Sequence, residues 1–362
     1  MISSHWLRFY LPTLALVLAC SSSDKLRSEQ PLIQELQSTD LEEADSLFVG
    51  RPTAFSVDRS HGFLIADGLS DRLLRFDSTG HADMVVWKTT PGVGKVSAIA
   101  QDGDGRVAVA IARENKLLVG AVNDSVPQYA VFTRGPIGSI ASRPGGGWWV
   151  VTIDLTSRMA VHSLDSGVLS SSGGNLPVPH REAPGTAQIM WGSAAKATPT
   201  SVSYVFHGSD SIYTYRPSSG TVSARGIELP GVIMLEHRLR ELPPRSQRDA
   251  ESIVYGLPVP TMLGQTMGER AFIVWMYAKP RRGALTGTIR VQLLPSNGVS
   301  GCLSDTLPVA SAPYPRVSVS GDTIQVLEQT TVAGATRTRI RQFRIHPVGC
   351  RASASKSARP PA

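Results

Sequence analysis

The sequence predicts an all-β protein, a six-bladed β-propeller whose blades are four-stranded antiparallel sheets with two longer loop insertions. Three observations predict this fold. One pattern of strands and turns recurs along the chain. Hydrophobic residues make up 41% of the 362 positions, which is enough for a large core. The 33 glycines and 25 prolines suit many short strands joined by tight turns.

The clearest unit covers residues 52–76 and reads as three strands at 54–57, 62–66 and 73–76. A turn at 77–80 then leads to a fourth strand. The pattern returns in five more units, with only two of its strands evident in the fourth and the fifth. The third strands begin their apolar runs at Leu73, Leu117, Met159, Ile212, Ile289 and Ile340. Most of these spacings fit the roughly 40–50 residues of a four-stranded blade. Two longer spacings predict insertions at about 166–200 and 217–268.

One four-stranded sheet cannot bury both of its faces, and stacking the sheets around an axis buries them all. We therefore expect a monomeric propeller over residues 47–347. Residues 20–46 form a polar tether, and a strand near 32–36 or 47–49 joins the last blade to close the ring. Residues 348–362 are rich in Ser, Ala, Pro and basic residues and predict a disordered tail.

Residues 1–19 predict a signal peptide, because a positive start at Arg8 precedes an apolar stretch that is too short to cross a membrane as a helix. Residues 17–20, Val-Leu-Ala-Cys, resemble the bacterial lipobox. That resemblance implies an exported protein with a lipid on the thiol of Cys20, held in the cell envelope. With Ser21 next, it also implies the outer membrane if the cell has one. An ordinary leader cleaved after Ala19 is the alternative.

Two further cysteines, Cys302 and Cys350, remain in the mature chain. The compartment beyond the membrane permits disulfides. The sequence leaves two interpretations open, a disulfide between these residues or two buried or free thiols.

Three stretches of the first unit carry a family resemblance: Arg-Pro-Thr-Ala-Phe at 51–55, Gly-Phe-Leu-Ile-Ala-Asp at 62–67, and Asp-Arg-Leu-Leu-Arg-Phe-Asp at 71–77. They resemble six-bladed β-propellers of the NHL/TolB-like type, including uncharacterised lipoprotein members. The resemblance covers most of residues 48–346 and concerns the fold, because a shared fold does not transfer function.

Some six-bladed propellers are metal-dependent lactonases that hold a divalent cation in the axial channel. Asp67 and Asp154 end equivalent second strands here, but an aspartate at that position is expected to bond the backbone of its own turn. The run Asp102-Gly103-Asp104-Gly105 lacks the distal acidic ligand of a calcium loop and predicts a hairpin turn. We therefore expect no catalytic residue, no metal and no cofactor.

Two other patterns have structural interpretations. Trp148 and Trp149 are consecutive in one strand and point to opposite faces. Packing in the core or at an edge is expected for both, with a binding surface as the alternative for one. Arg337, Arg339 and Arg341 alternate along one strand and predict a solvated outer edge.

The net charge of +7 is spread along the chain, and the export signal argues against a nucleic-acid partner. The first hypothesis is an envelope-anchored binding or scaffold propeller for an unidentified protein, glycan or small ligand, rather than an enzyme. The alternative is a metal-dependent enzyme of lactonase or lyase type that uses the axial channel.

Overall fold

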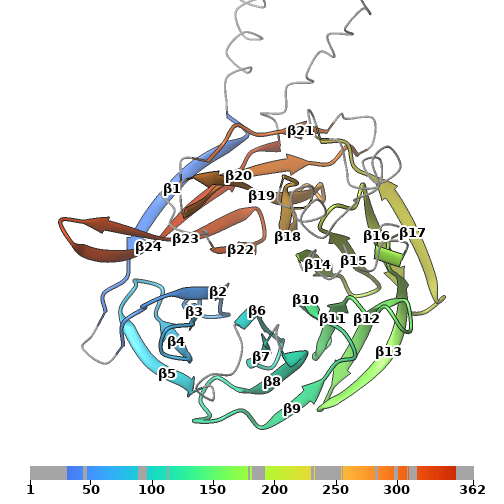
Figure 1. The fold of residues 1–362 in the computed structure, drawn as a ribbon, viewed down its shortest axis with the longest axis horizontal. Coiled ribbons are helices and arrows are strands. Elements are labelled where there is room, and N and C mark those ends of the chain that lie inside the picture. The colour runs from blue at the N-terminus through green and yellow to red at the C-terminus, as the bar shows by residue number, and fades with distance from the viewer. Residues whose placement is uncertain are drawn as a thin grey trace, which may run out of the picture.

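A computed structural model describes residues 31–43, 47–88, 96–111, 114–177, 180–181, 192–229, 232, 254, 256–281, 284–296, 301–307, 309 and 316–347. These residues form six four-stranded antiparallel sheets around a common axis (Figure 1), so the predicted propeller is confirmed. The signal peptide, Cys20 and the tail at 348–362 lie outside the described residues. None of the described segments is a helix with the length and hydrophobicity that a membrane crossing requires.

In the first five blades the chain runs from an inner strand at the axis to an outer strand at the rim. The first blade consists of β2 (Pro52–Val57), β3 (Phe63–Asp67), β4 (Arg72–Phe76) and β5 (Ala82–Lys88). The second consists of β6 (Val96–Gln101), β7 (Arg106–Ile111), β8 (Lys116–Ala121) and β9 (Tyr129–Phe132). The third consists of β10 (Ile137–Ser142), β11 (Trp148–Thr152), β12 (Met159–Asp165) and β13 (Val168–Asn175).

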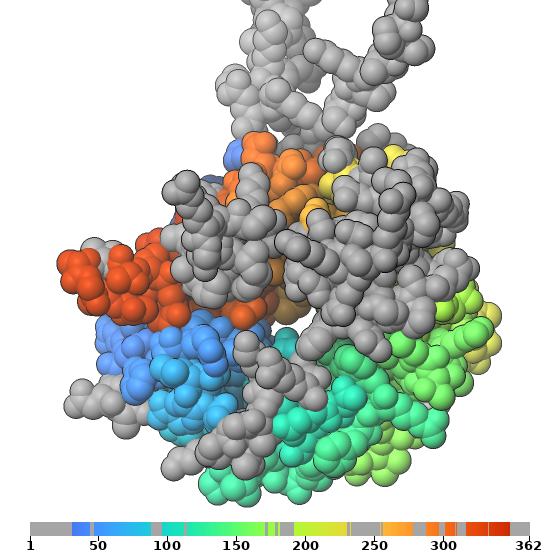
Figure 2. Space-filling model, in the orientation of Figure 1, coloured from blue at the N-terminus to red at the C-terminus, as the bar shows by residue number. Residues whose placement is uncertain are grey.

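The fourth blade consists of β14 (Ser193–Ala197), β15 (Val202–Phe206), β16 (Ser211–Arg216) and β17 (Thr221–Gly226). The fifth consists of β18 (Val259–Gln265), β19 (Ala271–Arg281), β20 (Ala284–Leu293) and β21 (Cys302–Leu303). In the space-filling view the coloured sectors follow one another around the ring in chain order (Figure 2).

The sixth blade is built from both ends of the chain. Its first three strands from the axis outward are β22 (Arg316–Ser320), β23 (Thr323–Val332) and β24 (Ala335–Ile345), and its outer strand is β1 (Ile33–Asp40). β1 pairs with β24 from Ile33 opposite Ile345 to Asp40 opposite Arg339. The strand that closes the ring therefore lies before residue 47. Of the two predicted positions, near 32–36 and near 47–49, it overlaps the first.

The core consists of six hydrophobic clusters, one between each pair of neighbouring blades. In β3, Phe63 faces the sixth blade, whereas Leu64 faces the second. Successive side chains of a strand point to opposite faces, and here both faces are covered. The second strands therefore read as continuous apolar runs. Trp148 and Trp149 follow this rule, since each is buried against a different neighbouring blade, and core packing is confirmed for both.

Both insertions are shorter than the sequence predicted. They span 176–192, between β13 and β14, and 227–258, between β17 and β18. The predicted ranges wrongly included four strands, the outer strands β13 and β17 and the inner strands β14 and β18. β14 reads Ser-Ala-Ala-Lys-Ala and β18 contains proline and glycine, so neither shows a bulky apolar run. β13 is rich in Ser and Gly, and most of β17 is exposed. An outer strand has less of its surface covered by neighbouring blades, so it lacks the apolar run by which a buried strand is recognised in the sequence.

The predicted solvated edge at Arg337, Arg339 and Arg341 is also wrong over most of β24, because β1 covers that strand. The guanidinium of Arg341 donates to Glu35 of β1 with an Nε–Oε1 distance of 2.8 Å. Arg339 donates to Glu328 of β23 in the same blade. These arginines join strands to one another.

Candidate functional site

The inner strands of the six blades lie around the axis (Figure 1), and each contacts the next around the ring. Two cavities lined by described residues of these strands form an axial channel. The one at the starts of the inner strands, which we call the upper chamber, has a volume of about 370 Å³. The lower chamber, at the ends of the same strands, has a volume of about 290 Å³. Ile99, Ile140 and Met262 line both cavities, and they form an apolar waist between the chambers.

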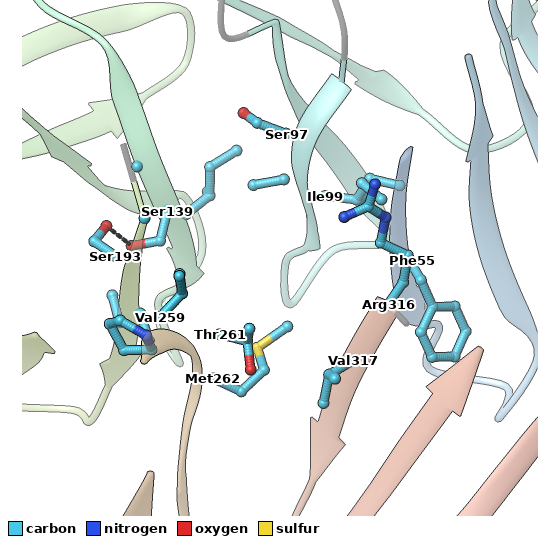
Figure 3. Close-up of a pocket in the computed structure, with 18 of the residues that line it drawn as sticks. Phe55, Ser97, Ile99, Ser139, Ser193, Val259, Thr261, Met262, Arg316 and Val317 are labelled. Atoms are coloured by element: carbon cyan, nitrogen blue, oxygen red, sulfur yellow. Dashed lines mark hydrogen bonds between the residues drawn. The ribbon is translucent and has the colours of Figure 1, made fainter. Parts of the chain in front are cut away.

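The wall of the upper chamber is mostly apolar, with a few polar groups (Figure 3). The hydroxyls of Ser139 on β10 and Ser193 on β14 lie 2.9 Å apart in a buried hydrogen bond. Arg316 of β22 lies across the cavity from the two serines (Figure 3), and its Nε donates to the carbonyl of Pro52 at 3.3 Å. A compact, largely apolar molecule with one or two polar groups matches this wall.

The lower chamber is more polar, and its lining includes two charged residues, Asp58 and Lys196. Burial opposes ionisation of Asp58, but hydrogen bonds from Ser60, Arg75 and the backbone of Gly62 outweigh it and lower the pKa of this carboxyl. The Arg75 Nε lies 2.9 Å from the Asp58 carboxylate. Burial lowers the pKa of Lys196.

The aspartates that end second strands hold their own turns, as predicted. A carboxylate oxygen of Asp67 accepts the backbone N–H of Leu69 at 3.1 Å. A carboxylate oxygen of Asp154 accepts the N–H groups of Thr156 and Ser157 at 2.9 and 3.1 Å. Within the described ranges, no group of three His, Cys, Asp or Glu residues is placed to hold a metal ion.

Asp102 is likewise a turn residue. Its carboxylate accepts the backbone N–H groups of Asp104 and Arg106 at 2.9 and 3.0 Å, in the hairpin between β6 and β7. The guanidinium of Arg106 returns to the same carboxylate at 2.7 Å. The predicted hairpin is therefore confirmed.

The cysteine predictions fall largely outside the described residues. Cys302 lies in β21 and is disulfide-bonded. Cys350 and Cys20 lie beyond the described ranges. The pairing of Cys302 with Cys350 and the lipid on Cys20 therefore stay predictions.

Two buried histidines were not singled out from the sequence. His180 lies in the first insertion and His207 directly follows β15. The His207 ring donates to backbone carbonyls of the second insertion, at Val254 and Leu257. Among the described residues, neither ring nitrogen of His180 nor Nε2 of His207 has a hydrogen-bond partner. Burial lowers the pKa of His180 to about 3 and the pKa of His207 to about 4.

This pair lies just behind the upper chamber, because the His207 N–H donates to the carbonyl of Gly192, a lining residue, at 2.8 Å. The two residues are far apart in the sequence, with no ligand-like spacing. No local pattern could therefore have marked them as neighbours.

The sequence matches no protein-family model and no curated protein. Solved structures resemble the fold. A protein of Bacteroides fragilis described as exported is 12% identical, with 87% of this chain and 96% of that chain covered and a TM-score of 0.59. A member of the DUF4221 family from Bacteroides vulgatus is 9% identical, with 88% and 99% covered and a TM-score of 0.55. Virginiamycin B lyase from Staphylococcus aureus is 12% identical, with 87% and 100% covered and a TM-score of 0.51. At such identities these likenesses speak for the fold alone, and the chain is a six-bladed β-propeller.

Proposed function

We propose that this chain is an envelope-anchored binding propeller that holds a small ligand in the upper chamber of its axial channel. The observation that carries the proposal is the chamber itself. Its volume of about 370 Å³ lies within the roughly 300–1,000 Å³ of small-molecule sites. Such sites combine an apolar wall with a few polar groups, and Ser139, Ser193 and Arg316 supply those groups here.

The chamber is well suited to binding because its walls are held rigidly. Each inner strand is one edge of a blade, and the apolar clusters between blades pack against it on both sides. A preformed site spends little of the binding energy on ordering side chains. The ligand that fits is compact and mostly apolar, with a hydrogen-bonding group toward Ser139 and Ser193 or an acceptor toward Arg316.

Several features support the envelope part of this proposal. The leader at 1–19, the lipobox-like residues ending at Cys20 and the polar stretch that follows are those of a lipid-anchored protein. One fold neighbour is described as an exported protein. The resemblance of the first blade to NHL/TolB-like repeats, a group that includes lipoprotein members, also supports it.

The ligand hypothesis is tested by filling the chamber. Ser97 is exposed and lines the upper chamber, so S97W should occupy it without disturbing the core. Ser223 is exposed on the outer strand β17, so S223W is the matched control. The mature wild type and both variants are screened by thermal shift against a library of small envelope metabolites. We expect compounds that raise the melting temperature of the wild type and S223W but not of S97W.

If every compound that raises the melting temperature of the wild type raised that of S97W equally, the binding site would lie elsewhere and the proposal would be contradicted. A wild type that no compound stabilises would also count against it.

The alternative is an enzyme of lactonase or lyase type that uses the same channel. The observation that favours it is the fold likeness to virginiamycin B lyase. Natively purified mature protein that retained one divalent metal ion per chain would favour this alternative over simple binding.

A further inference from the structure

Lys196 is a partly buried cation in the lower half of the channel. It lies on β14 between Ala195 and Ala197, whose side chains pack toward the third blade. Because side chains alternate along a strand, Lys196 points to the other face. There it lines the lower chamber together with Met262 and Leu263 of β18.

The ammonium of Lys196 has no hydrogen bond or ion pair to any described residue. The other charged lining residue, Asp58, is already satisfied, because its carboxylate accepts hydrogen bonds from Ser60, Gly62 and Arg75 at 2.7 to 2.9 Å. The described lining of the upper chamber adds Arg316 and no carboxylate. The described lining of the two chambers therefore carries two cations, Lys196 and Arg316, and one carboxylate, Asp58, which is already paired with Arg75.

Such an arrangement opposes folding. Partial burial of an ammonium with no counter-charge among its described neighbours is unfavourable, and lysine is rarely buried unless it is paired. Local rules of this kind are broken mainly at functional sites. An anion that enters the chamber would provide the missing counter-charge.

We propose that the lower chamber binds a small oxyanion, a carboxylate or phosphate group, with Lys196 as its counter-charge. Ser142 on β10 and Ser320 on β22 line the same cavity and supply hydroxyl donors from other blades. The volume of about 290 Å³ admits such a group with part of its hydration. The apolar waist separates this site from the upper chamber, so the inference goes beyond the ligand proposed there.

The test is isothermal titration calorimetry of the full mature protein at low ionic strength, with inorganic phosphate and acetate as separate probes. Low salt matters because mobile ions screen exposed charges. We expect the wild type to bind at least one probe, and the tighter of the two identifies the kind of oxyanion. K196M should weaken that binding by about tenfold or more, whereas K196R should remain within about threefold of the wild type.

Two controls separate this site from other effects. K116M removes a lysine that faces Glu114 at 3.8 Å and lies over the ring of Phe132, away from the channel, and should leave anion affinity unchanged. S97W fills the upper chamber and should also leave it unchanged, so the two proposals can fail independently. K196M should melt at or above the wild-type temperature, because it removes a partly buried charge that has no partner among the described residues.

The proposal is overturned if the wild type binds neither anion at millimolar concentrations. It is equally overturned if K196M keeps the wild-type affinity or if K116M loses as much as K196M.

Discussion

Buried carboxylates at the ends of strands hold the turns of this propeller. The carboxylates of Asp67, Asp154 and Asp102 each accept a backbone N–H group from the residue two positions later in the chain. A carboxylate that accepts such bonds satisfies donors that the sheet leaves unpaired. These residues are therefore structural, although their positions resemble those of ligands in a metal-binding channel.

The hairpin at Asp102 allows a paired test. The Asp102 side chain is fully buried and Asp104, two residues on, is 71% exposed. We expect D102A to lower the free energy of unfolding by about 2–3 kcal/mol, because it leaves backbone donors and Arg106 without their acceptor. D104A should cost at most about 0.5 kcal/mol. Urea unfolding measures both, and similar losses in the two variants would refute this assignment.

The histidine pair predicts a loss of stability in mild acid. His180 and His207 stay neutral in the folded chain down to about pH 3 and 4, whereas an unfolded histidine titrates near 6.5. The unfolded chain therefore binds more protons as the pH falls below about 6.5. Stability is fully present above that pH and declines toward pH 4, by up to about 1.4 kcal/mol per pH unit for each histidine.

H180F tests this directly. The imidazole lies against the ring of Phe206, with 5.0 Å between ring centroids. Neither of its nitrogens has a partner within the described part of the chain, so phenylalanine suits the site. The variant should be at least as stable as the wild type at pH 7.5. Its stability should also fall less steeply between pH 6.5 and 5 in urea unfolding. An unchanged slope would show that His180 does not carry the effect.

At the scale of strands, the position of a strand within its blade decides whether it can be recognised from its sequence pattern. Second strands such as β3 and β11 are covered on both faces and appear as continuous apolar runs. Outer strands such as β17 are largely exposed and carry no such pattern. The arginines of β24 were misassigned because whether a strand is an edge depends on its neighbour, and that neighbour is about three hundred residues earlier.

Ring closure by β1 can be tested by truncation. A chain that starts at Pro31 keeps the whole of β1 (Ile33–Asp40), whereas one that starts at Leu41 lacks it. Loss of β1 exposes the edge of β24 and leaves Arg341 without Glu35. An unpaired edge also promotes pairing between chains. We expect the shorter chain to melt at a lower temperature and to associate in size-exclusion chromatography.

The chain that starts at Pro31 serves as the control and should melt at the temperature of the mature protein. If both truncated chains behaved alike, β1 would not contribute to ring closure.

For the whole molecule, the proposed lipid on Cys20 would decide where the propeller is held. Each acyl methylene that enters a bilayer contributes about 0.8 kcal/mol, so several chains anchor a domain firmly. We expect the wild type to partition into the detergent phase and C20S into the aqueous phase. Mass spectrometry of the N-terminal peptide should show an acylated Cys20. An unmodified cysteine after Ala19 would instead support an ordinary leader.

The sequence by itself determined the all-β class, the six repeats and the third strand of each repeat, because strands that are buried on one or both faces carry a local apolar pattern. Only the tertiary structure decided which strand closes the ring and which residues meet at the axis. Ser139 and Ser193 form one hydrogen bond from two blades, and Lys196 faces residues of several others. These neighbours are brought together by the stacking of sheets around an axis, and no spacing along the chain records that stacking.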